Sequence, residues 1–239
     1  MEMENTQTKS EMVRDMFNNI APTYDKLNHI LSFEIDRLWR RRVVNIVSRR
    51  GAKRILDMAT GTGDLAIAMA KRIPGSTIYG ADFSSEMLAV ARHKIESQGL
   101  DERILLSECN AENIDLEDGV VDAATVAFGV RNFEHQTQAL AEIVRTIRPG
   151  GHLIILEFSN PNNSAVRWVY RTYSHRLLPT IGKAISHNKG AYTYLPESID
   201  QFPDPMRFVR ILRDLGLVNI TKRSQSFGIA HIYIAQKPE

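Results

Sequence analysis

Short apolar runs alternate with segments of helical periodicity through most of the chain. The run over residues 120–128 is nearly all apolar, which is typical of a central strand in a parallel sheet. The helical segment at 136–148 is expected to end at Pro149-Gly150-Gly151. Repeated strand–helix units predict an α/β fold with a doubly wound, mostly parallel sheet that binds ligands at the carboxyl ends of its strands. The predicted strands lie at residues 55–56, 77–81, 103–107, 120–128 and 152–158.

The two ends of the chain complete this fold. Helical periodicity is also present at 11–20, 35–50 and 205–215, while residues 21–33 fit no single element. Alternating positions at 217–223 and 228–236 predict a C-terminal antiparallel hairpin, which brings the sheet to seven strands. We expect a single domain over residues 1–239. Its predicted parts are N-terminal helices and a lid (1–50), a cofactor-binding core (51–160), an insertion facing the substrate or a membrane (161–205) and a C-terminal helix with strands (206–239).

Composition narrows the classes of function. The 239 residues are 43% hydrophobic, enough for one large core, and the net charge of +2 does not require a nucleic-acid partner. The single cysteine, Cys109, cannot form an internal disulfide and favours a reducing compartment. We see no secretory signal, no apolar run of about 18 residues and no paired histidine spacing for a metal. A cytoplasmic protein without a bound metal is therefore expected.

The first strand leads into a glycine loop that favours a particular ligand. Gly61 and Gly63 stand one residue apart before a helix, so free backbone N–H groups face whatever lies over the turn. The same spacing also fits a dinucleotide-binding loop. Asp57, at the mouth of the turn, would repel a pyrophosphate but hold a cationic amine, and Asp82 ends the next strand where an acid binds ribose hydroxyls. S-adenosylmethionine has such an amine, a sulfonium and no phosphate, so it is the expected cofactor.

The carboxyl ends of the other strands converge on the same ligand. The loop at 59–63 is expected beneath its methionine part, and Phe83 and Met87 beside its adenine. Asn110 is expected at the adenine edge, although asparagine is also typical of a turn. The fourth strand ends where the reacting carbon should lie. The predicted cofactor-binding residues are Asp57, Ala59, Gly61, Thr62, Gly63, Asp82, Phe83, Met87, Asn110, Ala111 and Ala127.

These strand-end motifs resemble those of the class I S-adenosylmethionine-dependent methyltransferases. More narrowly, the stretch from Tyr24 through Trp39 resembles the first signature of the quinone C-methyltransferases of menaquinone and ubiquinone biosynthesis. Residues 145–159 resemble their second signature, the segment 128–132 is similar to theirs, and the likeness extends over about residues 11–237. The chain departs from the family pattern at Leu27, at Asp36, in the Arg-Thr-Ile-Arg sequence of 145–148, and at Ala127, where some members have serine.

The resemblance implies a Rossmann-like methyltransferase that methylates a ring carbon of a prenylated hydroquinone. It implies demethylmenaquinol as the substrate, with the benzoquinol step of ubiquinone biosynthesis as the alternative. A cation near the ring oxygen would stabilise a phenolate, and Arg131 is the expected catalytic cation unless it pairs with Glu134 or Asp25. Tyr24 and Asn132 are expected to orient the ring oxygens as the other catalytic residues. His231 is a further candidate for this polar cluster.

Other interpretations stay open. Asp57 disfavours a nicotinamide-dependent oxidoreductase, and the intact glycine loop disfavours an inactive scaffold. Three successive arginines at 40–42 suggest a nucleic-acid-binding methyltransferase fold, but the small net charge does not. A prenylated substrate must come from a bilayer, so weak peripheral contact with the inner face of a membrane is expected through the aromatic and basic segment at 165–186. The alternative for this segment is packing on the sheet or on the second subunit of a homodimer.

Overall fold

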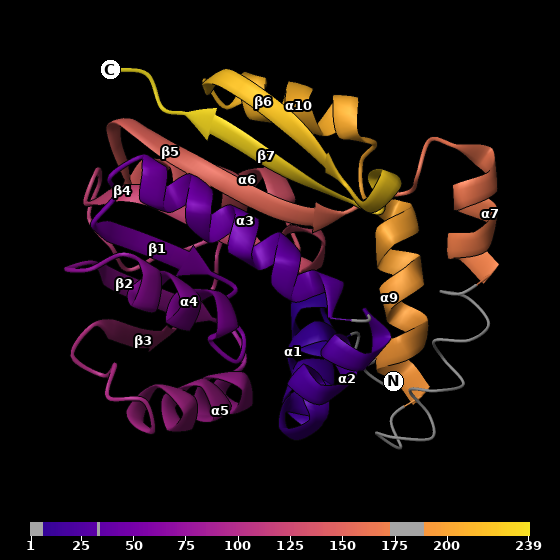
Figure 1. Cartoon of the computed structure of the whole chain (residues 1–239), viewed down its shortest axis with the longest axis horizontal. Coiled ribbons are helices and arrows are strands. Elements are labelled where there is room, and N and C mark those ends of the chain that lie inside the picture. The colour runs from indigo at the N-terminus through magenta and orange to yellow at the C-terminus, as the bar shows by residue number, and fades with distance from the viewer. Residues whose placement is uncertain (1–6, 33, 173–188) are drawn as a thin grey trace, which may run out of the picture.

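A seven-stranded sheet runs through the computed structural model, which describes residues 7–32, 34–172 and 189–239 (Figure 1). Its order is β3 (Ile104–Glu108), β2 (Thr77–Asp82), β1 (Arg54–Met58), β4 (Val121–Ala127), β5 (Ile147–Phe158), β7 (Ala230–Gln236) and β6 (Val218–Gln225). The first five strands in this order pair in parallel, and β7 is antiparallel to both β5 and β6. This topology confirms the predicted doubly wound, mostly parallel sheet with its C-terminal antiparallel hairpin.

Helices cover both faces of the sheet. The helices α3 (Ile35–Arg49), α4 (Asp64–Arg72) and α5 (Ser85–Glu96) pack on one face, and α6 (Gln136–Thr146) and α10 (Pro205–Asp214) pack on the other. Successive strand residues point to opposite faces, so Ile55 and Ile154 join the first apolar cluster while Leu56 and Ile155 join the second. Because both faces are buried, the central strands are continuous apolar runs in the sequence.

Further helices lie across the carboxyl ends of the strands, where the sheet would otherwise be open (Figure 1). These are α1 (Lys9–Ile20), the short 3-10 turn η1 (Ala21–Thr23), α2 (Tyr24–Leu31) and α9 (Lys189–Gln201). A capping box begins α1, because Thr8 and Glu11 each accept a hydrogen bond from the other's backbone N–H. At its other end Ile20 and Ala21 are buried against Met87 of α5, which anchors these helices over the sheet. The stretch that fitted no single element in the sequence is therefore largely η1 and α2.

The Pro-Gly-Gly sequence is not a helix end, which corrects the sequence prediction. The helix α6 ends at Thr146 and β5 begins at Ile147, so Pro149-Gly150-Gly151 lies within the first residues of the strand. The pairing of β5 with β4 shifts register here, between Val121 and Ala123. A Cβ at Gly151 would lie 2.6 Å from Cγ2 of Ile147, so the irregular strand needs a residue without a side chain at this point.

The predicted membrane-facing segment is described only at its start. The helix α7 (Ser164–Thr172) contains Trp168, Arg167 and Arg171. Residues 173–188, which include Tyr173, Arg176, Lys183 and the apolar residues Leu177, Leu178, Ile181 and Ile185 of that prediction, lie outside the described residues.

Candidate cofactor and substrate site

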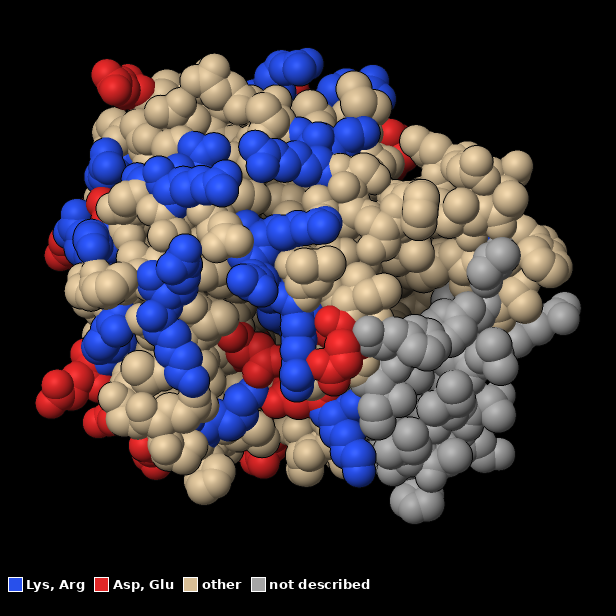
Figure 2. All heavy atoms as spheres, in the orientation of Figure 1, with Lys and Arg blue, Asp and Glu red and all other residues tan. Residues whose placement is uncertain are grey.

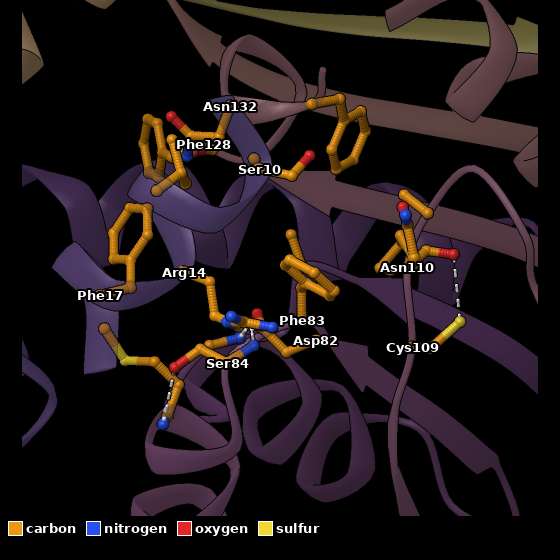
Figure 3. Close-up of a pocket in the computed structure, with 18 of the residues that line it drawn as sticks. Ser10, Arg14, Phe17, Asp82, Phe83, Ser84, Cys109, Asn110, Phe128 and Asn132 are labelled. Carbon is orange, nitrogen blue, oxygen red and sulfur yellow. Dashed lines mark hydrogen bonds between the residues drawn. The ribbon is translucent and has the colours of Figure 1, made fainter. Parts of the chain in front are cut away.

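A pocket lies at the carboxyl ends of β1, β2 and β4, with Ser10, Arg14 and Phe17 of α1 along one side (Figure 3). Such strand ends are the usual ligand site of a doubly wound sheet. Ten of the sequence-predicted site residues line it. They are Tyr24, Ala59, Gly61, Asp82, Phe83, Met87, Asn110, Ala111, Ala127 and Asn132.

The glycine loop leaves open space where a ligand can lie against the backbone. Gly61 has φ +57°, and among the described residues nothing lies within 4 Å of a Cβ built on it. Gly63, with φ +81°, precedes the first residue of α4, so the free N–H groups of that helix point toward the loop. Ala59 also has a positive φ of 57°, a strained conformation for a residue with a side chain. Strain of this kind is typical of binding sites.

Asp82 is held by backbone amides on one side and faces the pocket on the other. Its Oδ2 accepts a hydrogen bond from Gly61 N at 2.8 Å, and its Oδ1 accepts one from Ser84 N at 2.9 Å. Burial raises the pKa of this carboxyl, and these backbone donors oppose the rise. Each carboxylate oxygen has two acceptor sites, so both oxygens keep capacity for a pair of ligand hydroxyls.

Asp57 lies one layer below the pocket and does not line it. Its Oδ2 accepts from Thr60 Oγ1 at 2.8 Å and its Oδ1 from Thr125 Oγ1 at 2.6 Å. Burial raises the pKa of Asp57 to about 6, against the lowering effect of these two hydroxyls. Asp57 thus shapes the glycine loop from beneath, and its charge can reach a cationic ligand only through the loop.

Aromatic and polar side chains surround the part of the pocket beyond Asp82. The guanidinium of Arg14 lies over the Phe83 ring, 5.3 Å from its centroid (Figure 3). Across the pocket, Asn110 lines the wall while its Oδ1 accepts a hydrogen bond from Glu112 N at 3.0 Å. The asparagine is therefore both a wall residue and the turn residue that the sequence left as an alternative.

The three residues predicted to be catalytic lie together at the end of β4. Tyr24 and Asn132 line the pocket beside Phe128. Arg131 is the residue before Asn132 in the 3-10 turn η2 (Val130–Asn132) and lies behind the pocket wall. Burial raises the pKa of the Tyr24 hydroxyl, and the positive charges of Arg40 and then Arg131 partly oppose the rise. Burial also raises the pKa of Tyr194 of α9, where Arg131 lowers it and Glu157 raises it. The Tyr194 hydroxyl donates to Asn132 Oδ1 at 3.2 Å. The positive charge of Arg131 thus acts on two phenolic hydroxyls at this end of the pocket.

Arg131 pairs with neither of the partners weighed from the sequence. It is 6% exposed, and its Nη1 donates to Oε1 of the fully buried Glu157 at 2.7 Å and to Phe128 O at 2.5 Å. Its Nε has no hydrogen-bond partner among the described residues, and neither does Nδ1 of buried His231. His231 lies opposite Glu157 in the β5–β7 pairing, and burial lowers its pKa to about 4, so it is neutral near pH 7.

A hydrogen bond attaches α2 to the glycine loop, and ion pairs attach it through α5 to α4. Asp25 accepts from Thr62 Oγ1 at 2.5 Å and from Lys94 Nζ of α5 at 2.7 Å. The same ammonium donates to Asp64, the first residue of α4, at 2.5 Å. Thr62, predicted to touch the cofactor, is instead buried, and its hydroxyl donates to Asp25 of α2. We call Asp25, Thr62, Asp64 and Lys94 the α2 latch.

Several pocket residues were missed from the sequence. Ser10, Val13, Arg14 and Phe17 come from α1, whose amphipathic pattern marked a buried face but not what it covers. Tyr194, which donates to Asn132 but does not itself line the pocket, was also missed, because it follows a stretch with no recognisable motif. The only available signal for it was its place in an aromatic-rich region.

Comparison with known proteins shows which family shares these features. Residues 5–237 match the model of the ubiE/COQ5 methyltransferase family. A demethylmenaquinone methyltransferase of Thermus thermophilus is 46% identical over 93% of this chain and 100% of its own length. A ubiquinone/menaquinone biosynthesis C-methyltransferase of Geobacter sulfurreducens is 42% identical over 96% of this chain and 90% of its own length.

Solved structures share the fold at low identity. A SAM-dependent methyltransferase of Aquifex aeolicus superposes with a TM-score of 0.59 at 18% identity, covering 80% of this chain and 87% of its own. The [4+2]-cyclase SpnF superposes with a TM-score of 0.68, also at 18% identity, covering 97% and 96%. Since a cyclase shares the fold, the fold by itself does not determine the reaction.

Proposed function

Because the chain belongs to the ubiE/COQ5 methyltransferase family, we propose that it methylates a ring carbon of a prenylated hydroquinone, with demethylmenaquinol as its substrate. One observation carries this proposal beyond the family. The polar group formed by Tyr24, Asn132, Tyr194 and Arg131 adjoins the end of the pocket opposite Asp82, with the apolar ring of Phe128 beside it. A flat ring that bears two hydroxyls needs such a mixture of apolar wall and hydrogen-bonding groups.

S-adenosylmethionine is the methyl donor of this enzyme, and the pocket has the groups to bind it. The open space over Gly61 can accept the ligand, and Asp82 has free acceptor capacity for ribose hydroxyls. We assign Phe83, Met87, Asn110 and Ala111 to the adenine. When bound, the donor supplies an electrophilic methyl group that needs no further activation.

The work left to the protein is orientation and control of charge. The ring carbon becomes nucleophilic as the neighbouring hydroxyl loses its proton to a water molecule, and the positive charge of Arg131 stabilises the negatively charged oxygen that forms. Glu157 holds the guanidinium in place through Nη1. Asn132 Nδ2 and the Tyr24 hydroxyl, which stays protonated near pH 7, supply donors that fix the ring in its plane.

The choice of a naphthoquinol over a benzoquinol rests on the relatives. The Thermus protein is named for demethylmenaquinone alone, while the Geobacter protein is named for both quinones. Methylation in ubiquinone biosynthesis is therefore the alternative within the same chemistry.

Turnover with two substrates tests the proposal. The protein is incubated with S-adenosylmethionine and a short-chain demethylmenaquinol, or its benzoquinol counterpart, and the product is located by mass spectrometry. We expect methylation at a ring carbon, with kcat/KM about tenfold or more in favour of the naphthoquinol. A preference for the benzoquinol would establish the alternative. Absence of transfer to either quinol, in protein that binds S-adenosylmethionine, would overturn the proposal.

A prenylated quinol resides in a bilayer, so the enzyme must meet one. In the described part of the chain, none of the helices is both long enough and apolar enough to span a membrane. We therefore propose weak, reversible contact with the membrane surface as the route of supply.

A further inference from the structure

The turn between β6 and β7 holds an aromatic side chain in an exposed and strained position. Phe227, in the short turn η4 (Ser226–Gly228), is 85% exposed. Its backbone is left-handed, with φ 59° and ψ 24°, and Ser226 before it also has a positive φ of 43°. Both the conformation and the exposure cost free energy for a phenylalanine, and a residue that is 85% exposed buries little surface in return. Strain that persists in this way is typical of functional positions.

The turn is held firmly from behind, so it presents Phe227 in a defined direction. Trp39 Nε1 of α3 donates to Ser226 Oγ at 3.1 Å, and Arg42 donates to Gln225 Oε1. On the other side, the position of a Cβ on Gly228 lies 3.5 Å from Cα of Pro161. A rigid turn loses little conformational entropy when its side chain binds something.

A second exposed aromatic side chain lies at the same corner of the molecule. Trp168 of α7 is 71% exposed. The residue before it, Arg167, donates to Pro161 O at 2.7 Å and to Asn162 O at 2.9 Å, which joins α7 to the loop that packs against Gly228. Figure 1 places α7 and the end of the β6–β7 hairpin at one end of the sheet. We call Phe227 and Trp168 the aromatic corner.

Cations border the aromatic corner. Arg42 adjoins the turn through Gln225, whose Nε2 donates to Arg223 O at 3.0 Å. Arg223 is close enough to Arg50, at the end of α3, for their repulsion to help burial lower the pKa of Arg50. In Figure 2, Lys and Arg side chains gather over α3, while the neighbouring surface of α7 and the hairpin end is largely uncharged. Exposed aromatics beside a band of arginines match an anionic bilayer surface, with its apolar interior and phosphate headgroups.

We propose that the aromatic corner inserts into the headgroup region of an anionic lipid bilayer, with the arginines around α3 in contact with the lipid phosphates. The inference rests on the proposed function, since it is a prenylated substrate that gives the enzyme reason to dock there. A chain of contacts links the corner to the pocket. Trp39, which holds the turn, packs against Phe128 of the pocket wall with ring centroids 6.1 Å apart. Docking at this corner therefore brings the bilayer next to the side of the pocket where the ring must bind.

Vesicle sedimentation with Phe227→Asn tests the proposal. Asparagine tolerates the left-handed conformation, so this variant removes the ring while relieving the strain, and its melting temperature should be equal to or above that of the wild type. We expect its partition onto phosphatidylglycerol vesicles to be about tenfold weaker, from the lost burial of one phenylalanine. Adding Trp168→Ala to Phe227→Asn should weaken the partition onto these vesicles further. Leu105→Asn is the matched control, because Leu105 is exposed on β3, the opposite edge of the sheet, and its loss should leave binding unchanged.

The charge of the vesicle separates a membrane from other partners. Wild-type protein should bind phosphatidylglycerol vesicles and bind phosphatidylcholine vesicles weakly. Equal vesicle binding by wild type and Phe227→Asn would overturn the proposal. So would ultracentrifugation in which the wild type is a dimer, Phe227→Asn is a monomer and neither binds lipid, because the corner would then be a subunit interface. Binding of RNA in place of lipid, lost in Phe227→Asn, would overturn it as well.

Turnover distinguishes failure of this inference from failure of the proposed function. With a short-chain quinol in solution, Phe227→Asn should have the kcat and KM of the wild type. With a long-chain quinol embedded in phosphatidylglycerol vesicles, its rate should fall about as much as its vesicle binding. If the wild type methylates neither quinol, the proposed function fails. If Phe227→Asn matches the wild type on both substrates, only the docking site fails.

Discussion

The floor and the roof of the pocket are held by different forces. In the floor, formed by the glycine loop and the strand ends, Asp82 accepts from Gly61 N at 2.8 Å and Thr60 N donates to Ala81 O at 3.0 Å. In the roof, formed by α1, α2 and α9, the helix α2 is attached by Lys94, whose Nζ donates to Asp25 at 2.7 Å. Backbone hydrogen bonds in a parallel sheet hold one geometry, whereas partly exposed ion pairs are weak and screened by salt.

This difference divides the expected consequences of mutation. Changes to the floor should remove cofactor binding, because the backbone there is itself the binding surface. Changes behind the pocket should act on catalysis, and changes to the roof should alter how often the pocket is closed.

The strongest test of the floor is Gly61→Val. A branched side chain would occupy the open space over the loop and would oppose the positive φ of 57°. We expect calorimetry to show an S-adenosylmethionine affinity that is lower by about 100-fold or more. The valine side chain would take the space of the ligand, and the loop backbone would lose the conformation that binds it. Gly75→Val is the matched control, because Gly75 also has a positive φ of 70° and open space around it among the described residues, yet does not line the pocket.

The control separates strain from obstruction. Both variants should lose stability through their left-handed backbone, and Gly75→Val alone should still bind S-adenosylmethionine. Retained affinity in a folded Gly61→Val protein would show that the ligand does not lie over this loop.

Behind the pocket, the Arg131–Glu157 pair separates catalysis from folding. Arg131→Met alone would leave Glu157 buried and unpaired, at a cost of about 3–5 kcal/mol of stability. Adding Glu157→Gln removes that charge and should restore much of the stability. We expect kcat of the double variant to stay about 100-fold low with S-adenosylmethionine affinity nearly unchanged, because the cation acts on charge that develops during the reaction.

Steady-state kinetics and thermal melts of the single and double variants provide the measurement. If the double variant regains both stability and kcat, Arg131 has a structural role only.

The floor was also the part that sequence could predict. Its glycines and acids come from a few contiguous residues at strand ends, and short motifs of this kind can be recognised in the sequence without knowledge of the rest of the fold. The roof depends on pairs that are remote in the chain, such as Lys94 with Asp25, 69 residues apart, and Tyr194 with Asn132, 62 residues apart. Periodicity indicates which face of a helix is buried, but not which polar groups meet.

Local signals also failed where a longer-range contact took precedence. Pro149-Gly150-Gly151 has the composition of a helix end, yet the residues on either side of it, Ile147 and His152, pair with β4, so it lies within β5. Arg131 was weighed against Glu134 and Asp25, while its partner Glu157 lies on β5, which the sheet brings beside β4. Both outcomes follow from the pairing of strands that are far apart in the chain, and a short stretch of sequence holds no information about that pairing.

The pH dependence of binding sharpens the comparison within the floor. Burial raises the pKa of Asp57 to about 6 from its ordinary value of 3.8. Its protonated form therefore stabilises the fold at low pH, and this contribution is lost as pH rises through 6. A cationic ligand favours the ionised form, so S-adenosylmethionine affinity should rise about tenfold between pH 5 and 7. Calorimetry across this range should show weaker and nearly pH-independent binding in Asp57→Asn. The same slope in Asp57→Asn would assign the effect to another group.

The smallest effect is expected in the roof, from Lys94→Met. The methionine keeps most of the packing of the lysine stem but removes the charge that joins Asp25 to Asp64. Because this pair is partly exposed, its loss is worth about 1 kcal/mol or less, and we expect kcat/KM to fall only about threefold. Lys71→Met, which changes an exposed lysine of α4 outside the latch, is the matched control and should leave kcat/KM unchanged.

The dependence of activity on salt provides the decisive measurement. Screening weakens the ion pairs of the latch in the wild type, whereas Lys94→Met has no such ion pairs to weaken. The activities of the two proteins should therefore converge as sodium chloride is raised from low to about 0.5 M. A constant ratio at all salt concentrations would mean that the ion pair does not hold α2.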